Sequence, residues 1–305
     1  MKIVTKRLWV FAILFAIMCN LSFAASAAAY PSTSATYDIY DLVRSAAKSG
    51  GCSQMVPQGI TFASDYLLIS AYCGDETGTH NSVIYVFNES DKSYYGTIKL
   101  PGTAHVGGVA YDCSTSGNIW VSNGNSVGCF KYSKLADCKG KVLSVTYNRV
   151  ADLSYSASTM CYDAVNDYLW IAQFSETDSE KSFARCYAVN NKTTTSPTLP
   201  YQFQISVPLK TQGISVRGNR MMISSSYGRT KDSQLYSYTW DQSKKVNTLK
   251  STTTLPPLSE GVVMGTTYAY VVYESVSPVY YDTCTSPVRY FAAYDENVKI
   301  FDGLN

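Results

Sequence analysis

Residues Lys210 to Arg229 read KTQGISVRGNRMMISSSYGR, and this stretch contains the structural unit that the rest of the chain repeats. It runs through a turn, a short apolar strand, a tight Gly-Asn turn, a second strand and a polar tail. The residue that opens the first strand has counterparts at intervals of 48 to 53 residues: Gly59, Gly108, Met160, Gly213 and Gly261. A unit repeated at a fixed period of this length is typical of a β-propeller.

Each unit contains further runs that favour strands, because they are rich in Tyr, Val, Ile and Thr. The second runs begin at Tyr66, Asn118, Tyr168, Arg220 and Tyr268, and the third runs at Ser82, Gly128, Arg185, Gln234 and Arg289. A fourth, less regular run precedes the next unit: YYGTIKLPG, VLSVTYN, YQFQISVPL and NTLKSTTTL. Four strands in each of five units predict an all-β fold, a five-bladed β-propeller with four-stranded blades.

Two segments compete to close the ring of blades. Residues 38–48 (DIYDLVRSAAK) fit one short N-terminal helix that ends at Gly50–Gly51, or they supply an outer strand for the last blade. Residues 298–303 (VKIFDG) are the other candidate for that outer strand. The sequence leaves this choice open.

The first 29 residues have the layout of an export signal. Three basic residues precede an apolar run from Leu8 to Met18, and small residues follow up to Ala29. We expect a signal peptide over residues 1–29 and a secreted, extracellular, monomeric protein with one propeller domain over residues 30–305. No other segment is expected to span a membrane. Without the signal, 22 basic and 23 acidic side chains nearly balance, so nucleic acid is not an expected partner.

Eight cysteines lie outside the predicted signal, an even number that favours disulfides in an exported protein. Antiparallel strands place Cys52 and Cys73 on one face of the first blade, and Cys113 and Cys138 on the opposite face of the second. We predict these two disulfides. The remaining cysteines in strand positions, Cys129, Cys161 and Cys186, stand where other units have apolar residues and are expected to be buried.

No metal or cofactor is expected, because the sequence contains neither a CxxC spacing nor a cluster of Cys and His. The loop from Cys73 to His80, CGDETGTH, resembles a calcium loop only loosely, since the EF-hand spacing is missing. Calcium is therefore the one metal ion that we keep as an alternative.

The first strand of each propeller blade lines the central axis, so the residues that precede the opening positions meet at one mouth of the channel. These residues are Gln58, Gly107, Thr159, Gln212 and Glu260, a mostly polar set where a core would contain Val or Ile. The second strands end at the same mouth with Tyr72, Asn123, Gln173, Tyr227 and Glu274, and Arg229 follows. His105 is close enough in sequence to reach the gap at Gly107. We expect Tyr72 to serve packing.

This polar ring supports two functional hypotheses. In the first, a small polar ligand such as a carbohydrate or a peptide end binds to Gln58, Asn123, Thr159, Gln212, Tyr227 and Arg229. In the second, Glu260 acts with Glu274 or His105 as acid and base in a hydrolase, lyase or cyclising transferase. A purely structural or interaction role is the third alternative, since polar residues at propeller mouths also bind backbone groups and water. Whether the protein is an enzyme stays open.

The segments PQGITF, HVGGVAYD, NIWVSN, TQGISV, ISSSYGR, LSEGVV and VVYES resemble a family of secreted β-propellers of Gram-positive bacteria. The resemblance covers nearly all of the mature chain, implies a propeller and export, and carries no activity. The Gln-Gly and Glu-Gly steps are also similar to those of plant- and bacterial-type glutaminyl cyclases, which are five-bladed propellers. That second resemblance rests on the dipeptides alone and implies the cyclising transferase named above.

Overall fold

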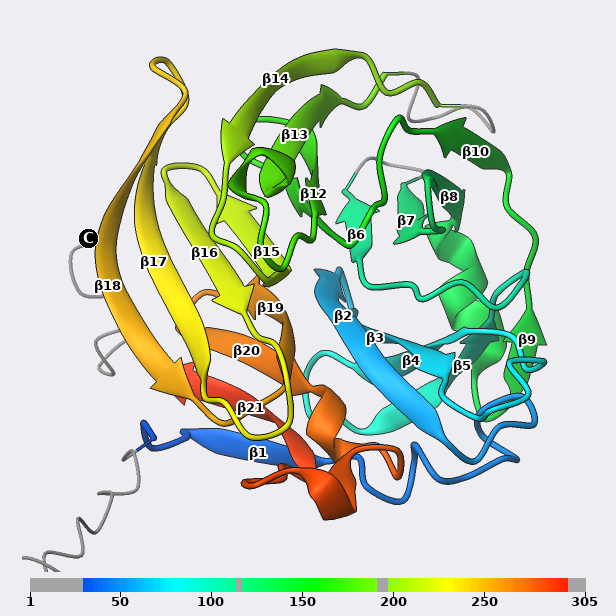
Figure 1. Ribbon diagram of the computed structural model, residues 1–305. Helices are drawn as coiled ribbons and strands as arrows, with labels where there is room; N and C mark the ends of the chain where they lie inside the picture. The colour runs from blue at the N-terminus through cyan, green and yellow to red at the C-terminus, as the bar shows by residue number, and fades with distance from the viewer. Residues whose placement is uncertain (1–29, 114–116, 191–196, 296–305) are drawn as a thin grey trace, which may run out of the picture.

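The computed structural model describes residues 30–113, 117–190 and 197–295, which form five sheets arranged as blades around a central axis (Figure 1). The first blade contains β2 (Met55–Ala63), β3 (Tyr66–Cys73), β4 (Val83–Asn88) and β5 (Tyr94–Lys99). The second contains β6 (Val109–Asp112), β7 (Asn118–Ser122), β8 (Ser126–Lys131) and β10 (Arg149–Asp152). The predicted five-bladed propeller is confirmed.

The other three blades follow the same order from the axis outward. The third contains β11 (Thr159–Asp163), β12 (Tyr168–Gln173), β13 (Phe183–Ala188) and β14 (Tyr201–Ser206). The fourth contains β15 (Thr211–Arg217), β16 (Arg220–Ser225), β17 (Ser233–Asp241) and β18 (Val246–Leu255). The fifth contains β19 (Ser259–Met264), β20 (Tyr268–Tyr273), β21 (Tyr290–Asp295) and β1 (Ala35–Asp38).

The ring is closed by the strand β1, which comes from the opposite end of the chain to the rest of its blade (Figure 1). It pairs antiparallel with β21, and Ala35 lies opposite Ala293. The following residues 40–51 form consecutive turns and not one continuous helix. The alternative closing segment, residues 298–303, lies outside the described residues, as does the predicted signal at residues 1–29.

The fourth strand of the second blade differs from the prediction. The predicted run VLSVTYN contains β9 (Val142–Ser144), which pairs in parallel with β5 at the outer edge of the first blade. The short 3-10 helix η1 (Tyr132–Cys138) carries the chain back to that edge, and the second blade takes β10 as its outer strand instead. A strand that one unit adds in parallel to the sheet of another unit does not change the spacing of the repeat, so the sequence pattern could not predict this pairing.

The five inner strands, β2, β6, β11, β15 and β19, contact one another in a closed circle around the axis. Two of the repeated glycines lie where the backbones of neighbouring inner strands nearly touch. A Cβ atom on Gly213 would lie 2.5 Å from the carbonyl oxygen of Glu260, and one on Gly261 would lie 2.7 Å from that of Gln58. No side chain fits there, so the repeat needs glycine at these positions for space.

Hydrophobic side chains fill the wedges between neighbouring blades. Between the third and fourth blades, Trp170 packs edge-on against Phe203 and Trp240, with ring centroids 5.4 and 5.2 Å away. Phe203 and Trp240 stack with an interplanar angle of 18°. Among the described residues, the buried hydrophobic side chains form five such clusters, one between each pair of neighbouring blades, and these clusters tie each blade to the next.

The structure contains one of the two predicted disulfides. Cys52 and Cys73 are bonded, with a Cα–Cα distance of 6.1 Å. The predicted Cys113–Cys138 disulfide is wrong, because both cysteines are free: Cys113 is exposed, whereas Cys138 is buried at the end of η1 with its thiol directed to the carbonyl oxygen of Leu135. The error follows from the misplaced fourth strand. The strand-borne cysteines Cys129, Cys161 and Cys186 are buried, as predicted.

We expect a thiol-specific alkylating reagent to modify Cys113 rapidly in the native protein. The other five free cysteines of the described residues are buried and need local opening before they react. Mass spectrometry of peptides after a short exposure measures this. Rapid modification of Cys138 alongside Cys113 would contradict the placement of η1.

Within the described part of the chain, no helix has the length and apolar character needed to cross a bilayer.

Candidate functional site

Three of the predicted site residues belong to β-bulges at the start of inner strands. In β2, Gln58 and Gly59 together lie opposite one residue of β3, and in β19 Glu260 and Gly261 lie opposite one residue of β20. Gln212 of β15 is the extra residue of a third bulge. A bulge bends the strand and redirects a side chain. The Gln-Gly and Glu-Gly steps of the repeat therefore direct their polar side chains toward the channel mouth.

Glu260 and Glu274, which we call the acid pair, lie beside Gln58 at this mouth. The amide nitrogen of Gln58 donates a hydrogen bond of 2.6 Å to Glu274 Oε1 and a second one to its neighbour, the carbonyl oxygen of Pro57. Glu260 and Gln58 are each 1% exposed, and Glu274 is 7% exposed. Side chains from the first and last blades, more than 200 residues apart in sequence, therefore form one buried polar cluster.

Two oxygen atoms of this cluster are buried without a hydrogen-bond partner among the described residues, namely Gln58 Oε1 and Glu260 Oε1. A buried acceptor without a partner costs about 1–3 kcal/mol, and proteins rarely leave one unexplained. Both atoms belong to side chains that were singled out from the sequence as ligand-binding or catalytic candidates. They are the strongest local indication that a further group binds here.

The pKa values of both carboxyl groups of the acid pair are raised. Burial, with the nearby charge of Glu274, raises the pKa of Glu260 well above its usual range. Burial also raises the pKa of Glu274, to about 7, although its hydrogen bond from Gln58 and the charge of Arg229 oppose this shift. At neutral pH the pair therefore keeps at least one proton, held mainly on Glu260. Two adjacent carboxyl groups with separated pKa values are able to act as proton donor and acceptor.

Aromatic side chains surround the acid pair. Tyr72, at the end of β3, stacks on His105 with ring centroids 4.3 Å apart, and its hydroxyl lies 3.2 Å from that of Tyr280. Burial and the charge of Glu274 raise the pKa of Tyr72, so its hydroxyl stays protonated. Desolvation by surrounding protein atoms lowers the pKa of His105, so its ring is neutral at pH 7, although part of the residue is exposed to solvent. The expectation that Tyr72 serves packing alone is incomplete, because its ring forms part of this mouth.

Arg229 lies at the rim of the same mouth. Its Nη1 donates a hydrogen bond of 3.0 Å to Thr283 Oγ1, and its guanidinium carbon lies 4.9 Å from the centroid of the Tyr280 ring. Within the described residues it forms no ion pair with Glu274, even though its charge lowers the pKa of that carboxyl. The acid pair is therefore not neutralised by a direct salt bridge.

The backbone that leads into this mouth is strained. Val106 and Leu258, two residues before Gly108 and Glu260, have φ angles of 49° and 64°, values that cost an L-residue about 1–2 kcal/mol. Hydrogen bonds hold both residues: Ser70 Oγ of β3 donates to the carbonyl oxygen of Val106, and the amide of Glu274, directly after β20, donates to that of Leu258. Strain of this kind gathers at functional sites, where the surrounding structure maintains it.

The structure brings only part of the predicted polar ring together. Thr159 is buried in β11, and Gln212 is half-buried in its bulge; neither hydrogen bonds to the acid pair within the described chain. Asn123 closes the turn between β7 and β8 through a hydrogen bond to Ser126. Tyr227 is 46% exposed and lies near Phe174 and Lys210. Asn123 is thus explained by a local turn, and Tyr227 is at most a rim residue.

Sequence reasoning missed Tyr280. This residue follows the short 3-10 helix η3 (Glu274–Val276), in a long connection between β20 and β21. The other blades have shorter connections there, so the repeat provides no counterpart for it. The only available signal was the length of this connection and its aromatic content.

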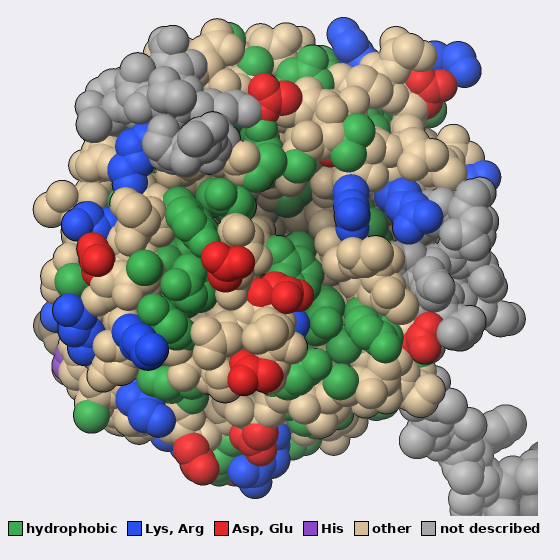
Figure 2. All heavy atoms as spheres, turned by 180° about the vertical axis from the view of Figure 1, so that it is seen from behind, with side chains coloured by type: hydrophobic (Ala, Val, Ile, Leu, Met, Phe, Trp, Pro, Cys, Tyr) green, Lys and Arg blue, Asp and Glu red, His purple; other side chains and the backbone are tan. Residues whose placement is uncertain are grey.

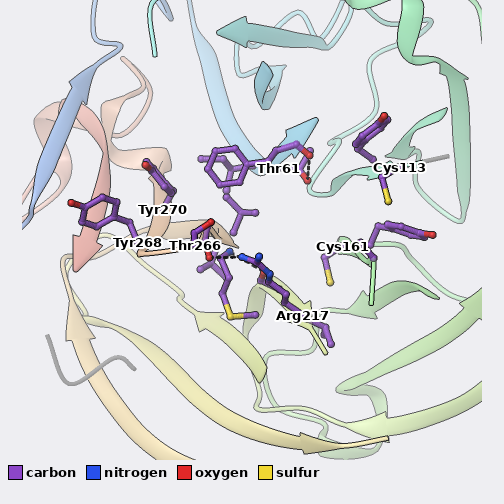
Figure 3. A pocket seen from close by; sticks show the side chains of 18 of the residues that line it. Thr61, Cys113, Cys161, Arg217, Thr266, Tyr268 and Tyr270 are labelled. Carbon is purple, nitrogen blue, oxygen red and sulfur yellow. Dashed lines mark hydrogen bonds between the residues drawn. The ribbon is translucent and has the colours of Figure 1, made fainter. Parts of the chain in front are cut away.

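A second hollow lies at the opposite mouth of the channel, where the face in Figure 2 is concave near its centre. It is a cavity of about 800 Å³ (Figure 3). Its lining includes Thr61, Phe62, Cys113, Cys161, Arg217, Met264, Tyr268 and Tyr270. Cys113 is the one predicted site residue among them. This cavity and the unpartnered carboxyl oxygen of Glu260 thus lie at different mouths. We place the candidate functional site at the acid pair, because a buried acid without a partner costs free energy and an open cavity does not.

Comparisons with known proteins bear on the fold. No family model matches the chain, and no curated protein matches its sequence. Among solved structures, the glutaminyl cyclase of Myxococcus xanthus is similar with a TM-score of 0.52 and 8% identity, over 79% of this chain and 90% of that one. A tail fiber of Staphylococcus aureus phage P68 aligns with a TM-score of 0.48 and 11% identity, over 71% of this chain and 46% of that one. At such identities the likeness to the glutaminyl cyclase shows a shared fold and nothing about activity.

Proposed function

We propose that this protein is an exported propeller that binds a small polar ligand with a basic nitrogen, such as a peptide end or an amino sugar, at the acid pair. The observation that carries the proposal is that Gln58 Oε1 and Glu260 Oε1 are buried without partners. A ligand that donates hydrogen bonds to both atoms removes their desolvation cost.

The charge of the cluster favours a cationic donor over a neutral one. Glu274, with a pKa of about 7, is partly ionised at neutral pH, and no side-chain cation forms an ion pair with it among the described residues. An ammonium group supplies both the missing positive charge and up to three donors. The hydroxyl groups of Tyr72 and Tyr280, which lie 3.2 Å apart at the same mouth, offer further acceptors to such a group.

The test is a thermal-unfolding screen with matched ligand pairs. We expect glucosamine to raise the unfolding temperature more than glucose, and a peptide with a free amino terminus more than its acetylated form. At a concentration 100 times Kd the stabilisation is about 2.7 kcal/mol. Glu274→Gln, which removes the partly ionised carboxyl, is expected to abolish the difference, whereas Glu76→Gln, at an exposed carboxylate of the loop after β3, leaves it unchanged. Equal effects of the paired ligands, or a difference retained in Glu274→Gln, would contradict the proposal.

A second candidate function is a hydrolase, lyase or glutaminyl-cyclase-like transferase at the same residues. The observation that favours it is the separation of the two pKa values, which suits Glu274 as a proton acceptor and Glu260 as a donor. For cyclisation, the α-amine of an amino-terminal glutamine attacks its own side-chain carbonyl, Glu274 takes the amine proton, and Glu260 gives a proton to the departing ammonia. His105, neutral at pH 7 and stacked on Tyr72, is the alternative acceptor.

Ammonia release from glutaminyl peptides separates the two candidates. Binding of such a peptide without ammonia release supports the binding protein. Release that is lost in both Glu260→Gln and Glu274→Gln supports the transferase, and loss in His105→Ala with retention in Glu274→Gln assigns the base to the imidazole.

A further inference from the structure

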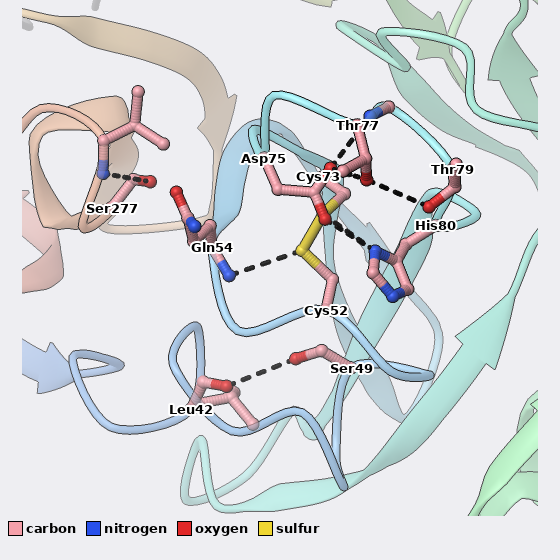
Figure 4. The surroundings of a disulfide bond; sticks show 12 residues. Leu42, Ser49, Cys52, Gln54, Cys73, Asp75, Thr77, Thr79, His80 and Ser277 are labelled. Carbon is pink, nitrogen blue, oxygen red and sulfur yellow. Dashed lines mark hydrogen bonds and ion pairs between the residues drawn. A yellow bond between two sulfur atoms is a disulfide. The ribbon is translucent and has the colours of Figure 1, made fainter.

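The connection that follows β3 contains a second cluster of reactive side chains, away from the acid pair. Cys73 is the last residue of β3, Asp75 and His80 lie on this connection, and Cys52 precedes β2 (Figure 4). His80 Nδ1 is 2.7 Å from Asp75 Oδ2 and 3.7 Å from Cys73 Sγ. One donor atom from each of the four side chains lies within 4.8 Å of all the others. The sequence analysis predicted no Cys/His cluster, because Cys52, 21 residues before Cys73, joins the loop residues Cys73, Asp75 and His80 only in the folded chain.

Hydrogen bonds and packing within the loop position Asp75 and His80. Asp75 Oδ1 accepts hydrogen bonds from Thr77 Oγ1 and the Gly78 amide, both at 2.9 Å, which leaves Oδ2 directed at His80. The His80 ring packs against Gly51, where a Cβ atom would lie 3.1 Å from its Cδ2 atom. The imidazole and the carboxylate are thus positioned beside the sulfur atoms by contacts that do not depend on the disulfide (Figure 4).

We propose that these four side chains form an exchangeable cross-link, which is a disulfide when oxidised and a zinc-type metal site after reduction. Reduction by a thiol or phosphine reductant adds two electrons and two protons and produces two thiols. A divalent metal ion then displaces both thiol protons and binds the two thiolates, His80 and Asp75. Two thiolates, one carboxylate and one neutral imidazole around a divalent ion leave the site with a single negative charge.

The donor set and its dimensions fit zinc. Tetrahedral zinc has ligand distances of about 2.0–2.3 Å, which places ligand atoms roughly 3.3–3.8 Å apart. The four donor atoms lie within 4.8 Å of one another, and the two sulfur atoms reach the zinc spacing by separating after reduction of the disulfide. The cysteines are buried, and the side chains of Asp75 and His80 are 17% and 35% exposed, so solvent reaches the donors from one side. Sulfur ligands disfavour calcium, which requires oxygen donors.

The two cysteines lie close in sequence to residues of the channel mouth that contains the acid pair. Cys73 directly follows Tyr72, and Cys52 lies six residues before Gln58 in the same segment. Either cross-link ties the start of β2 to the end of β3 across a sequence separation of 21 residues. We therefore infer that metal replaces the disulfide as the support for this side of the mouth under reducing conditions.

The test uses the mature chain with Cys113→Ser, which removes the exposed thiol, and cobalt(II) as a spectroscopic probe. After reduction with a phosphine, we expect one cobalt per chain with the absorption of a tetrahedral sulfur-ligated ion, displaced by zinc; the oxidised protein gives no such spectrum. His80→Ala and Asp75→Asn are expected to weaken the metal at least 10-fold and still form the disulfide. Glu76→Gln is the matched control and leaves affinity unchanged.

Three results would overturn the inference: no stoichiometric metal in the reduced protein, equal affinity in His80→Ala, or a reduced protein that unfolds and does not refold on zinc addition. Circular dichroism recorded in parallel identifies the third. None of these results concerns Glu260, so the proposed ligand site stands or falls separately.

Discussion

Replacing Gly261 with Ala is expected to destabilise the protein by about 3 kcal/mol or more, because overpacking of this kind forces a backbone to move. The new Cβ atom would lie 2.7 Å from both the Gln58 oxygen and the Ile60 nitrogen of β2. These are backbone atoms of an adjacent inner strand in a closed ring, so no side chain can rotate away to relieve the contact. Urea unfolding monitored by tryptophan fluorescence measures the change.

Gly102→Ala is the control, since a Cβ atom there meets nothing within 4 Å and only its φ of 88° is unfavourable. The expected cost is about 1–2 kcal/mol. If Gly261→Ala were no more destabilising than this control, the inner strands would be farther apart than the structure places them.

Glu274→Gln is expected to make the protein more stable above neutral pH. Below about pH 4.5 both the folded and the unfolded wild-type chains hold this proton, so Glu274 contributes nothing to pH dependence. Between that pH and about 7, the unfolded chain releases the proton while the folded chain keeps it. Stability therefore falls as pH rises, by about 3 kcal/mol in total, and stays low above pH 7. Glutamine does not titrate, so the variant avoids this loss.

Urea unfolding of wild type and variant between pH 4 and pH 8 measures the effect, with Glu76→Gln as an exposed control that keeps the wild-type profile. The gain in stability is expected together with the loss of ligand binding, as is common for residues retained for function. A variant with an unchanged pH profile would show that Glu274 titrates normally in the folded protein.

The blade repeat was visible in the sequence because each inner strand must bring its backbone against the next. That requirement fixes glycine at Gly59, Gly213 and Gly261. With Gly108 and Met160 these positions gave the period and the number of blades, and the strand-like runs between them gave four strands per blade. The pairing of β9 with the first blade was not predictable from the sequence, because a strand added at the edge of a sheet does not need glycine or any other fixed residue type. The disulfide Cys52–Cys73 followed from strand direction within one blade, whereas the wrong Cys113–Cys138 pair depended on the misplaced outer strand.

The site was predictable only as far as the repeat extends. Gln58, Glu260 and Glu274 occupy repeated positions, and the structure joins them. Tyr280 lies in a connection that has no counterpart in the other blades, and the cluster of Cys52, Cys73, Asp75 and His80 depends on how one loop folds back. Periodicity specifies where strands lie, but it does not specify loop conformation, and both of these features are built on loops.

The most direct measurement is a carbon-13 NMR titration of the glutamate carboxyl groups, with Glu260→Gln and Glu274→Gln used for assignment. We expect Glu274 to titrate near pH 7 and Glu260 to keep its proton to higher pH, and we expect each substitution to shift the midpoint of the remaining acid. Independent titration of both carboxyl groups below about pH 5 would be ordinary behaviour for glutamate and would contradict a coupled acid pair at the channel mouth.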